Sequence, residues 1–238
     1  FTPAVDVYQT KDSVVAETPL AGVDPKEPFD STPYGYALFD HFLRNPIGQE
    51  LGRKFKIAIS SSDEDDARAY LHDLGLIPKI VNGVYGFKIL LGGGLGAQPF
   101  LASVVKEFLP ANDIVNYATA ALKVFDQYGE RNKRNKARLK YLIKERGIEF
   151  VVEQIEKELE ELPQTEISFT APIEPRELLE SEPQVPTNLF DFSRWKSTNV
   201  LEQRTSKEVA VVVKIRNGNF STALARKLAD MISRYSPE

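Results

Sequence analysis

Two lysines in the segment RKFKIAISSS, Lys54 and Lys56, are the first candidates for chemistry. In a strand, residues two apart point to the same face. The alternating Phe55, Ile57 and Ile59 predict such a strand, with its other face packed on the core. If the lysine face were also covered, the ammonium groups would be partly desolvated and would need an anion. A solvated strand face is the alternative.

A glycine-rich segment, ILLGGGLGAQPF, is the second candidate. Gly92, Gly94 and Ala97 fit the pattern G-x-G-x-x-[GA], which marks loops that hold a dinucleotide pyrophosphate. That pattern needs a preceding strand, a following helix and an acidic residue about 20 positions further on, and Tyr117 lies in a helical pattern instead. Glycine amides can also bind another anion or form a structural turn. These residues leave the three alternatives open.

A basic segment, YGERNKRNKARLKYLIKERG, is the third candidate and contains six cations between Arg131 and Lys140. Arg131, Arg134 and Arg138 fall on one face of a predicted helix and could receive carboxylates or phosphates. The alternative is a solvated helix face. An RNA site is disfavoured, because the net charge is −4 and no aromatic residues are interleaved.

Hydrophobic periodicity predicts that helices and strands are mixed along the chain. Asn82-Gly83 predicts a two-residue hairpin turn. Ser61 and Glu64 form a capping box for a helix that ends at Gly75. The other predicted helices cover about residues 33–44, 99–108, 113–128, 133–146 and 148–162, and a C-terminal helix lies in NFSTALARKLADMISRYS after the apolar strand EVAVVVKIRNG.

The composition limits the class of protein. The net charge of −4 argues against a nucleic-acid binder, and no apolar run approaches the ~18–20 residues of a membrane span. With no cysteine in its 238 residues, the chain cannot form disulfides or hold an iron–sulfur cluster through thiolates. We expect a cytoplasmic protein. The start at Phe1 rather than Met suggests a fragment or a processed product.

Five segments, taken in order, resemble the siroheme-dependent nitrite/sulfite reductases over about residues 18–160. The segments are PLAGVDPKEPFDSTPYGYALFDHFLRNP, GRKFKIAISSS, HDLGLIPKI, GFKILLGGGLGAQPF and VFDQYGERNKRNKARLKYLI. Residues 189–238 are similar to the start of the ferredoxin-like half-domain that opens the second half of that family. The resemblance implies an α+β fold, with a mixed sheet and flanking helices followed by the start of that half-domain.

We therefore predict four parts of the chain: an N-terminal hairpin segment at 1–23, a siroheme-binding domain at 24–162, an acidic proline-rich linker at 163–187 and a partial half-domain at 188–238. Residues 1–23 themselves resemble the opening of the α-crystallin domain of small heat-shock proteins. A fusion at the shared PLAGVDP phrase would account for both likenesses.

The resemblance also implies roles for individual residues. Lys54 and Lys56 would bind the substrate anion over siroheme and help to deliver protons. The glycine-rich loop would contact the macrocycle and its carboxylates. Cationic side chains of the basic segment would pair with the same carboxylates. The residues implied in siroheme binding are Gly92, Gly93, Gly94, Gly96, Arg131 and Lys140. The implied reaction is the six-electron reduction of sulfite to sulfide or nitrite to ammonia, with ferredoxin as donor.

The chain departs from the family in one chemical respect. The family holds a [4Fe-4S] cluster through four cysteines, and this sequence has none. We therefore expect a truncated or chimeric piece that is inactive alone and whose partner is a missing C-terminal half. The alternatives are a nucleotide-binding module that uses the glycine-rich loop, and a non-catalytic chaperone-like or interaction protein led by residues 1–23.

Overall fold

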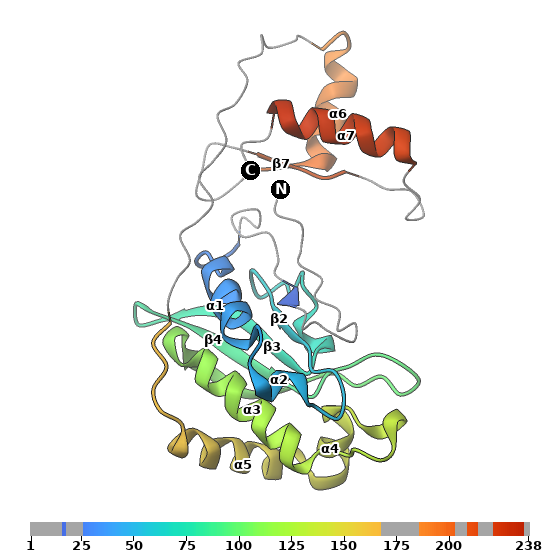
Figure 1. The fold of residues 1–238 in the computed structure, drawn as a ribbon. Helices are drawn as coiled ribbons and strands as arrows, with labels where there is room; N and C mark the ends of the chain where they lie inside the picture. Colours follow the sequence, from blue (N-terminus) through green and yellow to red (C-terminus); the bar gives the residue numbers. More distant parts are fainter. Residues whose placement is uncertain (1–15, 18–25, 168–185, 203–208, 214–220, 236–238) are drawn as a thin grey trace. The chain divides into compact units, whose positions relative to one another are not determined.

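The structure is a computed structural model that describes residues 16–17, 26–167, 186–202, 209–213 and 221–235. The chain divides into two compact units (Figure 1). One contains Ala4–Ala21 and Lys26–Thr170, and the other contains Ala171–Glu238. The hairpin predicted within residues 1–23 and most of the linker predicted at 163–187 lie outside the described residues, and the predicted domain boundaries stay a prediction.

The larger unit contains a five-stranded mixed sheet in the order β1-β2-β3-β4-β5. The first three strands pair in parallel and the last three pair antiparallel. The strands are β1 (Ala16–Glu17), β2 (Ile57–Ile59), β3 (Leu74–Val81), β4 (Val84–Leu91) and β5 (Ser103–Pro110). The predicted α+β fold with a mixed sheet is confirmed.

The turn between β3 and β4 is the one that the sequence predicts. Asn82 and Gly83 both have positive φ, 51° and 80°. A two-residue turn with two positive φ angles matches the twist of the strands that it joins, and asparagine followed by glycine adopts it at little cost. The register follows, with Val81 paired to Val84 and Leu74 to Leu91.

Five helices and three short 3₁₀ turns complete the larger unit as far as it is described. The helices are α1 (Thr32–Phe42), α2 (Pro46–Gln49), α3 (Ile114–Tyr128), α4 (Leu139–Arg146) and α5 (Ile148–Glu161). The turns are η1 (Ala69–Leu71), η2 (Ala111–Asp113) and η3 (Arg134–Lys136). The predictions of α1, α3 and α5 are confirmed within one or two residues at each end.

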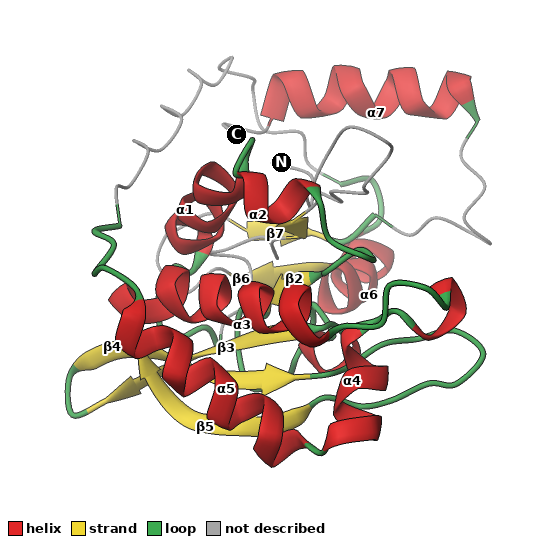
Figure 2. Cartoon of the chain, turned by 60° about the horizontal axis from the view of Figure 1, so that its bottom comes forward, coloured by secondary structure: helices red, strands yellow, loops and turns green. Residues whose placement is uncertain are grey.

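One face of the sheet carries the main core. Leu76 of β3, Phe87 of β4 and Ala121 of α3 are at most 1% exposed and belong to one hydrophobic cluster, to which α1, α4 and α5 also contribute. Figure 2 shows α3 and α5 running together along this face. The opposite face holds a smaller cluster around Ile77 and Leu90. β3 is therefore apolar on both faces.

Two predicted helices are wrong. The segment from Ser61 to Gly75 forms turns, η1 and the start of β3, because the Asp65 carboxylate accepts the N–H of Ala69 at 2.6 Å and reverses the chain. The apolar spacing that suggested a helix is divided among a turn, η1 and the first residue of β3, and so short an apolar pattern does not distinguish these elements from a helix. Residues 99–108, also predicted as a helix, lead into and form most of β5 on the edge of the sheet.

The predicted helix over 133–146 is correct only from Leu139 onward. The Glu130 carboxylate accepts the N–H groups of Asn132 and Lys133 at 2.6 and 3.1 Å, which holds the preceding residues in a turn. Arg131, Arg134 and Arg138 therefore do not share a helix face.

The smaller unit consists, in its described part, of α6 (Leu189–Asn199), β6 (Val200–Glu202), β7 (Val209–Val211) and α7 (Thr222–Tyr235). The two strands pair antiparallel. The predicted strand EVAVVVKIRNG is described over β7 and the two residues after it. Val209 and Val211 are 47% and 43% exposed, so this strand is not covered on both faces. No helix in the described part of the chain is long and apolar enough to span a membrane.

Gly75 provides a test of the β3 assignment. A Cβ at this position would lie 2.6 Å from the carbonyl oxygen of Ala69, so we expect Gly75→Ala to lower the free energy of unfolding by about 1–3 kcal/mol. Urea denaturation followed by far-UV circular dichroism measures the change. Ser103→Ala, at an exposed position of β5, is the control. Equal midpoints for Gly75→Ala and the wild type would contradict the close packing of β3 on η1.

Candidate functional site

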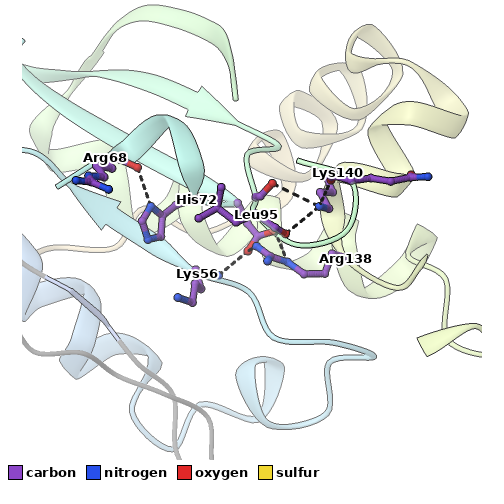
Figure 3. Close-up of polar contacts among 9 residues, drawn as sticks. Lys56, Arg68, His72, Leu95, Arg138 and Lys140 are labelled. Carbon is purple, nitrogen blue, oxygen red and sulfur yellow. Dashed lines mark hydrogen bonds and ion pairs between the residues drawn. The ribbon is translucent and has the colours of Figure 1, made fainter. Parts of the chain in front are cut away.

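Asp73, immediately before β3, joins two of the candidate segments through its side chain. Its carboxylate is fully buried and accepts two hydrogen bonds from Arg138, at 2.6 Å from Nη2 and 3.3 Å from Nε. It also accepts the backbone N–H of Lys56 at 3.0 Å. Figure 3 shows these contacts converging from separate parts of the chain. The carboxylate thus ties the lysine segment to the residue that precedes α4.

The backbone around Asp73 brings in the glycine-rich segment. Its carbonyl accepts the N–H of Gly92 at 2.9 Å, and the carbonyl of His72 accepts that of Gly93 at 2.8 Å. The next residue, Leu74, donates its N–H to the carbonyl of Lys56 at 3.0 Å. The structure therefore brings Lys56 and the glycine-rich segment together around residues 72–74.

Lys54 and Lys56 lie in an extended segment just before β2 rather than within the strand. The Lys54 side chain is exposed, and no hydrogen bond or ion pair of its ammonium group occurs within the described residues. Partial desolvation lowers the pKa of Lys54, and the nearby cations Lys56, Arg138 and Arg53 lower it further. A lysine among other cations, with few compensating carboxylates, favours an anion as neighbour.

We call residues 92–98 the glycine loop. Gly92 and Gly96 have φ angles of 90° and 114°, which other residues rarely adopt. At Gly93 a Cβ would lie 2.4 Å from the carbonyl oxygen of Tyr70, so only glycine allows this close approach. A Cβ at Gly94 would lie 3.2 Å from both Arg138 Nη2 and Lys140 Cδ.

The glycine loop does not have the surroundings of a dinucleotide site. It follows β4, the second strand of an antiparallel hairpin, and leads into β5 rather than into a helix. Tyr117, where the acidic residue would fall, is buried in α3. The match to the dinucleotide pattern therefore lacks the strand–loop–helix unit that gives the pattern its meaning.

Lys140 is buried beneath the glycine loop, with 3% of the residue exposed. Its Nζ donates to the carbonyl oxygens of Gly94, Leu95 and Gln98, at 3.4, 3.1 and 2.5 Å. Burial lowers the pKa of Lys140, and Arg138 lowers it further.

Arg131 has a different set of contacts. It forms an ion pair with Asp126 and donates to the carbonyl oxygens of Glu50 and Asp126, at 3.1 and 3.2 Å. Its side chain also lies against Gly52. Within the described part of the chain, the contacts of Arg131 join the end of α3 to the segment before Arg53 and do not include the glycine loop.

Sequence reasoning missed Asp73 and gave Arg53 no role. The Nε of Arg53 is buried and has no hydrogen-bond partner in the described structure. His72 is 9% exposed, with its Nδ1 2.9 Å from the carbonyl oxygen of Arg68, and burial lowers its pKa. For Asp73, the signal available in the sequence was its position in HDLGLIPKI, as an acidic residue just before a strongly apolar strand.

The resulting site concentrates positive charge. Lys56, Arg138 and Arg53 all lower the pKa of Lys54, and Asp73 opposes them. No group of three or more metal-ligating side chains occurs in the residues that the structure describes. The chemistry that this arrangement favours is the binding of an anion next to proton-bearing ammonium groups.

Comparison with known proteins gives a consistent result. A family model described as "Nitrite and sulphite reductase 4Fe-4S domain" matches residues 11–162. The chloroplastic ferredoxin–nitrite reductase of Zea mays is 30% identical over 146 residues, which cover 59% of this chain and 26% of that protein. The sulfite reductase [NADPH] hemoprotein beta-component of Myxococcus xanthus is 36% identical over 118 residues, which cover 46% of this chain and 21% of that protein.

A solved structure agrees with these matches. The Mycobacterium tuberculosis NirA protein superposes with a TM-score of 0.70 at 28% identity, covering 93% of this chain and 37% of that one. The chain thus spans about a quarter of the length of these curated relatives and little more than a third of the solved protein. The likeness of residues 1–23 to small heat-shock proteins is not borne out, since the reductase model begins within that segment, at residue 11.

The buried ion pair makes a measurable prediction. Asp73→Asn leaves the Arg138 guanidinium buried without its counter-charge, so we expect it to lower the free energy of unfolding by about 3–5 kcal/mol. The double variant Asp73→Asn/Arg138→Gln, which removes both charges, should lose clearly less than the two single variants combined. Denaturant unfolding of all four proteins gives the coupling energy. Additive losses would contradict the pairing.

Proposed function

Because the chain belongs to the nitrite and sulphite reductase family, we propose that the cations around Asp73 and the glycine loop bind siroheme and, beside it, nitrite or sulfite. The observation that carries this proposal is the convergence at Asp73: its carboxylate binds Arg138 and the N–H of Lys56 and acts electrostatically on Lys54, and its backbone carbonyl binds the glycine loop. Each segment alone had an ordinary structural explanation.

The residues fit the chemistry of siroheme, a macrocycle with carboxylates around its rim. Desolvated carboxylates need cations and N–H donors. Arg53, Lys54 and Arg138 provide cations, and the buried Nε of Arg53 is a donor without a partner in the described structure. A buried donor of this kind is unfavourable unless some group accepts its hydrogen bond, as a bound carboxylate would.

The protein's own groups would handle the substrate and its protons. When bound, siroheme would supply the iron through which electrons reach nitrite or sulfite. Lys54 and Lys56 would bind the oxyanion and hold protons near its oxygens, which leave as water during a six-electron reduction. The lowered pKa of Lys54 makes its ammonium group a better proton donor than an ordinary lysine.

A [4Fe-4S] cluster does not fit the residues of this chain. Such clusters are held by cysteine thiolates, and the sequence contains no cysteine. We therefore propose that these 238 residues bind siroheme and substrate but complete the reduction only with cysteine-bearing sequence from elsewhere. Relatives are named for ferredoxin or for NADPH, and ferredoxin is the donor we propose here.

Substitution of Lys54 tests the proposed substrate site. We expect the protein to bind siroheme saturably, and added nitrite to shift its visible absorbance. Lys54→Met removes one charge-assisted contact, so the nitrite dissociation constant should rise about tenfold or more. Lys157→Met, which removes an exposed lysine on α5, is the control and should leave that constant unchanged.

Two results would contradict this proposal. The absence of saturable siroheme binding by the wild-type protein would remove the cofactor site. An unchanged nitrite affinity in Lys54→Met, with siroheme still bound, would remove Lys54 from the substrate site.

The lowered pKa of Lys54 gives the direction of a pH effect. Below that pKa the ammonium group is charged and its attraction for nitrite is complete. As the pH rises through it, the proton and the attraction are lost, at a lower pH than for an ordinary lysine. We expect nitrite affinity to fall on the alkaline side in the wild type and to fall less in Lys54→Arg, whose charge persists. Identical alkaline profiles for the two proteins would contradict this assignment.

A further inference from the structure

We propose that Lys140 is a positioning residue whose buried ammonium group turns the peptide groups of the glycine loop, so that the N–H groups of Leu95 and Gly96 face an anion. This inference deepens the proposed function and rests on it for the identity of the anion. It gives Lys140 a different task from the direct contact with siroheme carboxylates that the resemblance implied.

The contacts of Lys140 are matched in number to its donors. An ammonium group has three N–H donors and no acceptor, and Nζ reaches the three carbonyl oxygens of Gly94, Leu95 and Gln98 (Figure 3). With all three donors used inside the loop, the group has none left for an external carboxylate. The aromatic rings of Phe100 and Tyr141, with centroids 5.4 and 5.2 Å from Nζ, further enclose the charge.

The orientation of the loop amides follows from peptide geometry. None of the described peptide bonds is cis, and in a trans peptide the C=O and N–H point in opposite directions. Because the carbonyls of Gly94 and Leu95 point toward Lys140, the N–H groups of the residues that follow them, Leu95 and Gly96, point away from it. Neither N–H donates to another backbone group in the described part of the chain.

The side away from Lys140 is open. A Cβ on Gly96 would meet no atom within 4 Å, and Leu95 is 60% exposed. Successive backbone N–H groups that face one open space form an anion-binding concavity. The bridge between Gly94 and Phe100 closes the loop at its base, so that Lys140 acts on a segment whose ends are already fixed.

A buried cation is needed to hold this arrangement. The three carbonyl dipoles converge, with their negative ends together, and without the ammonium group they would repel one another. The carbonyl of Gly94 would keep its hydrogen bond from the N–H of Phe100, while those of Leu95 and Gln98 would lose the bonds from Lys140. The loop could then relieve the strain by rotating its peptides, which would turn the N–H groups of Leu95 and Gly96 away from the open side. Lys140 therefore acts on an anion through the loop rather than by contact.

The test uses the isotopically labelled chain and sirohydrochlorin, the iron-free and diamagnetic form of the siroheme macrocycle. In the wild type, we expect sirohydrochlorin to shift the amide resonances of Leu95 and Gly96 and to slow their hydrogen exchange. Gly92 and Gly93, whose N–H groups already bond to residues 73 and 72, should be protected with or without ligand. They report whether the base of the loop is intact.

Lys140→Met should keep the protection of Gly92 and Gly93, lose the ligand-induced protection of Leu95 and Gly96, and weaken sirohydrochlorin binding about tenfold. Lys144→Met removes an exposed cation from the same helix and should change neither property. If Lys140 only stabilised the fold, its substitution would not change the exchange of the Leu95 and Gly96 amides while leaving that of Gly92 and Gly93 intact.

Three results would overturn the inference. One is that Lys140→Met binds sirohydrochlorin with unchanged affinity and keeps the ligand-induced protection of the Leu95 and Gly96 amides from hydrogen exchange. Another is tight binding by the wild type without any change at the amides of Leu95 and Gly96, a result that needs no variant and leaves the siroheme proposal standing. The third is loss of protection at Gly92 and Gly93 in Lys140→Met, which would show a general loosening of the loop. Absence of macrocycle binding by the wild type would instead overturn the proposed function.

Discussion

The arrangement of the site depends on the buried ion pair between Asp73 and Arg138. Removing two charges from water is expensive, and the pair persists because its geometry is close and the carboxylate has further donors. Through that carboxylate and its own backbone, Asp73 fixes the lysine segment, the residue before α4 and the first residue of the glycine loop. Burial raises the pKa of Asp73, and the Arg138 guanidinium opposes that rise.

The same pair leaves the site with an excess of positive charge. Asp73 pairs with Arg138, while Lys56, Arg138 and Arg53 all act on Lys54. Lys140 also lies within the field of Arg138, but its ammonium group donates to loop carbonyls. The chain therefore uses cations in two ways: some create attraction for an anion, and another shapes the backbone that presents N–H groups. The sequence does not distinguish these two kinds of cation; the contacts of each side chain in the structure do.

Sequence reasoning succeeded where the signal is local. The Asn82-Gly83 turn and the amphipathic helices α3 and α5 were predicted because their determinants lie within a few residues. It failed for the segment from Ser61 to Gly75 and for β5, where a helix was predicted, because apolar spacing alone does not distinguish η1 and an edge strand from a helix. Asp73 was missed because its partner Arg138 is 65 positions away. The resemblance to a known family supplied the candidate site, because spacing alone does not bring its segments together.

The separation in sequence between Asp73 and Arg138 has a consequence for how the chain acquires its site. β3, β4 and β5 follow one another with short connections and can pair early, because closing a small loop costs little entropy. The ion pair closes a loop of 65 residues and must wait for α3 and α4 to dock. On the ribosome, the sheet would therefore exist before the chain can recognise an anion. We expect cofactor capture to be a late event in folding, an order that pulsed hydrogen exchange during refolding can record.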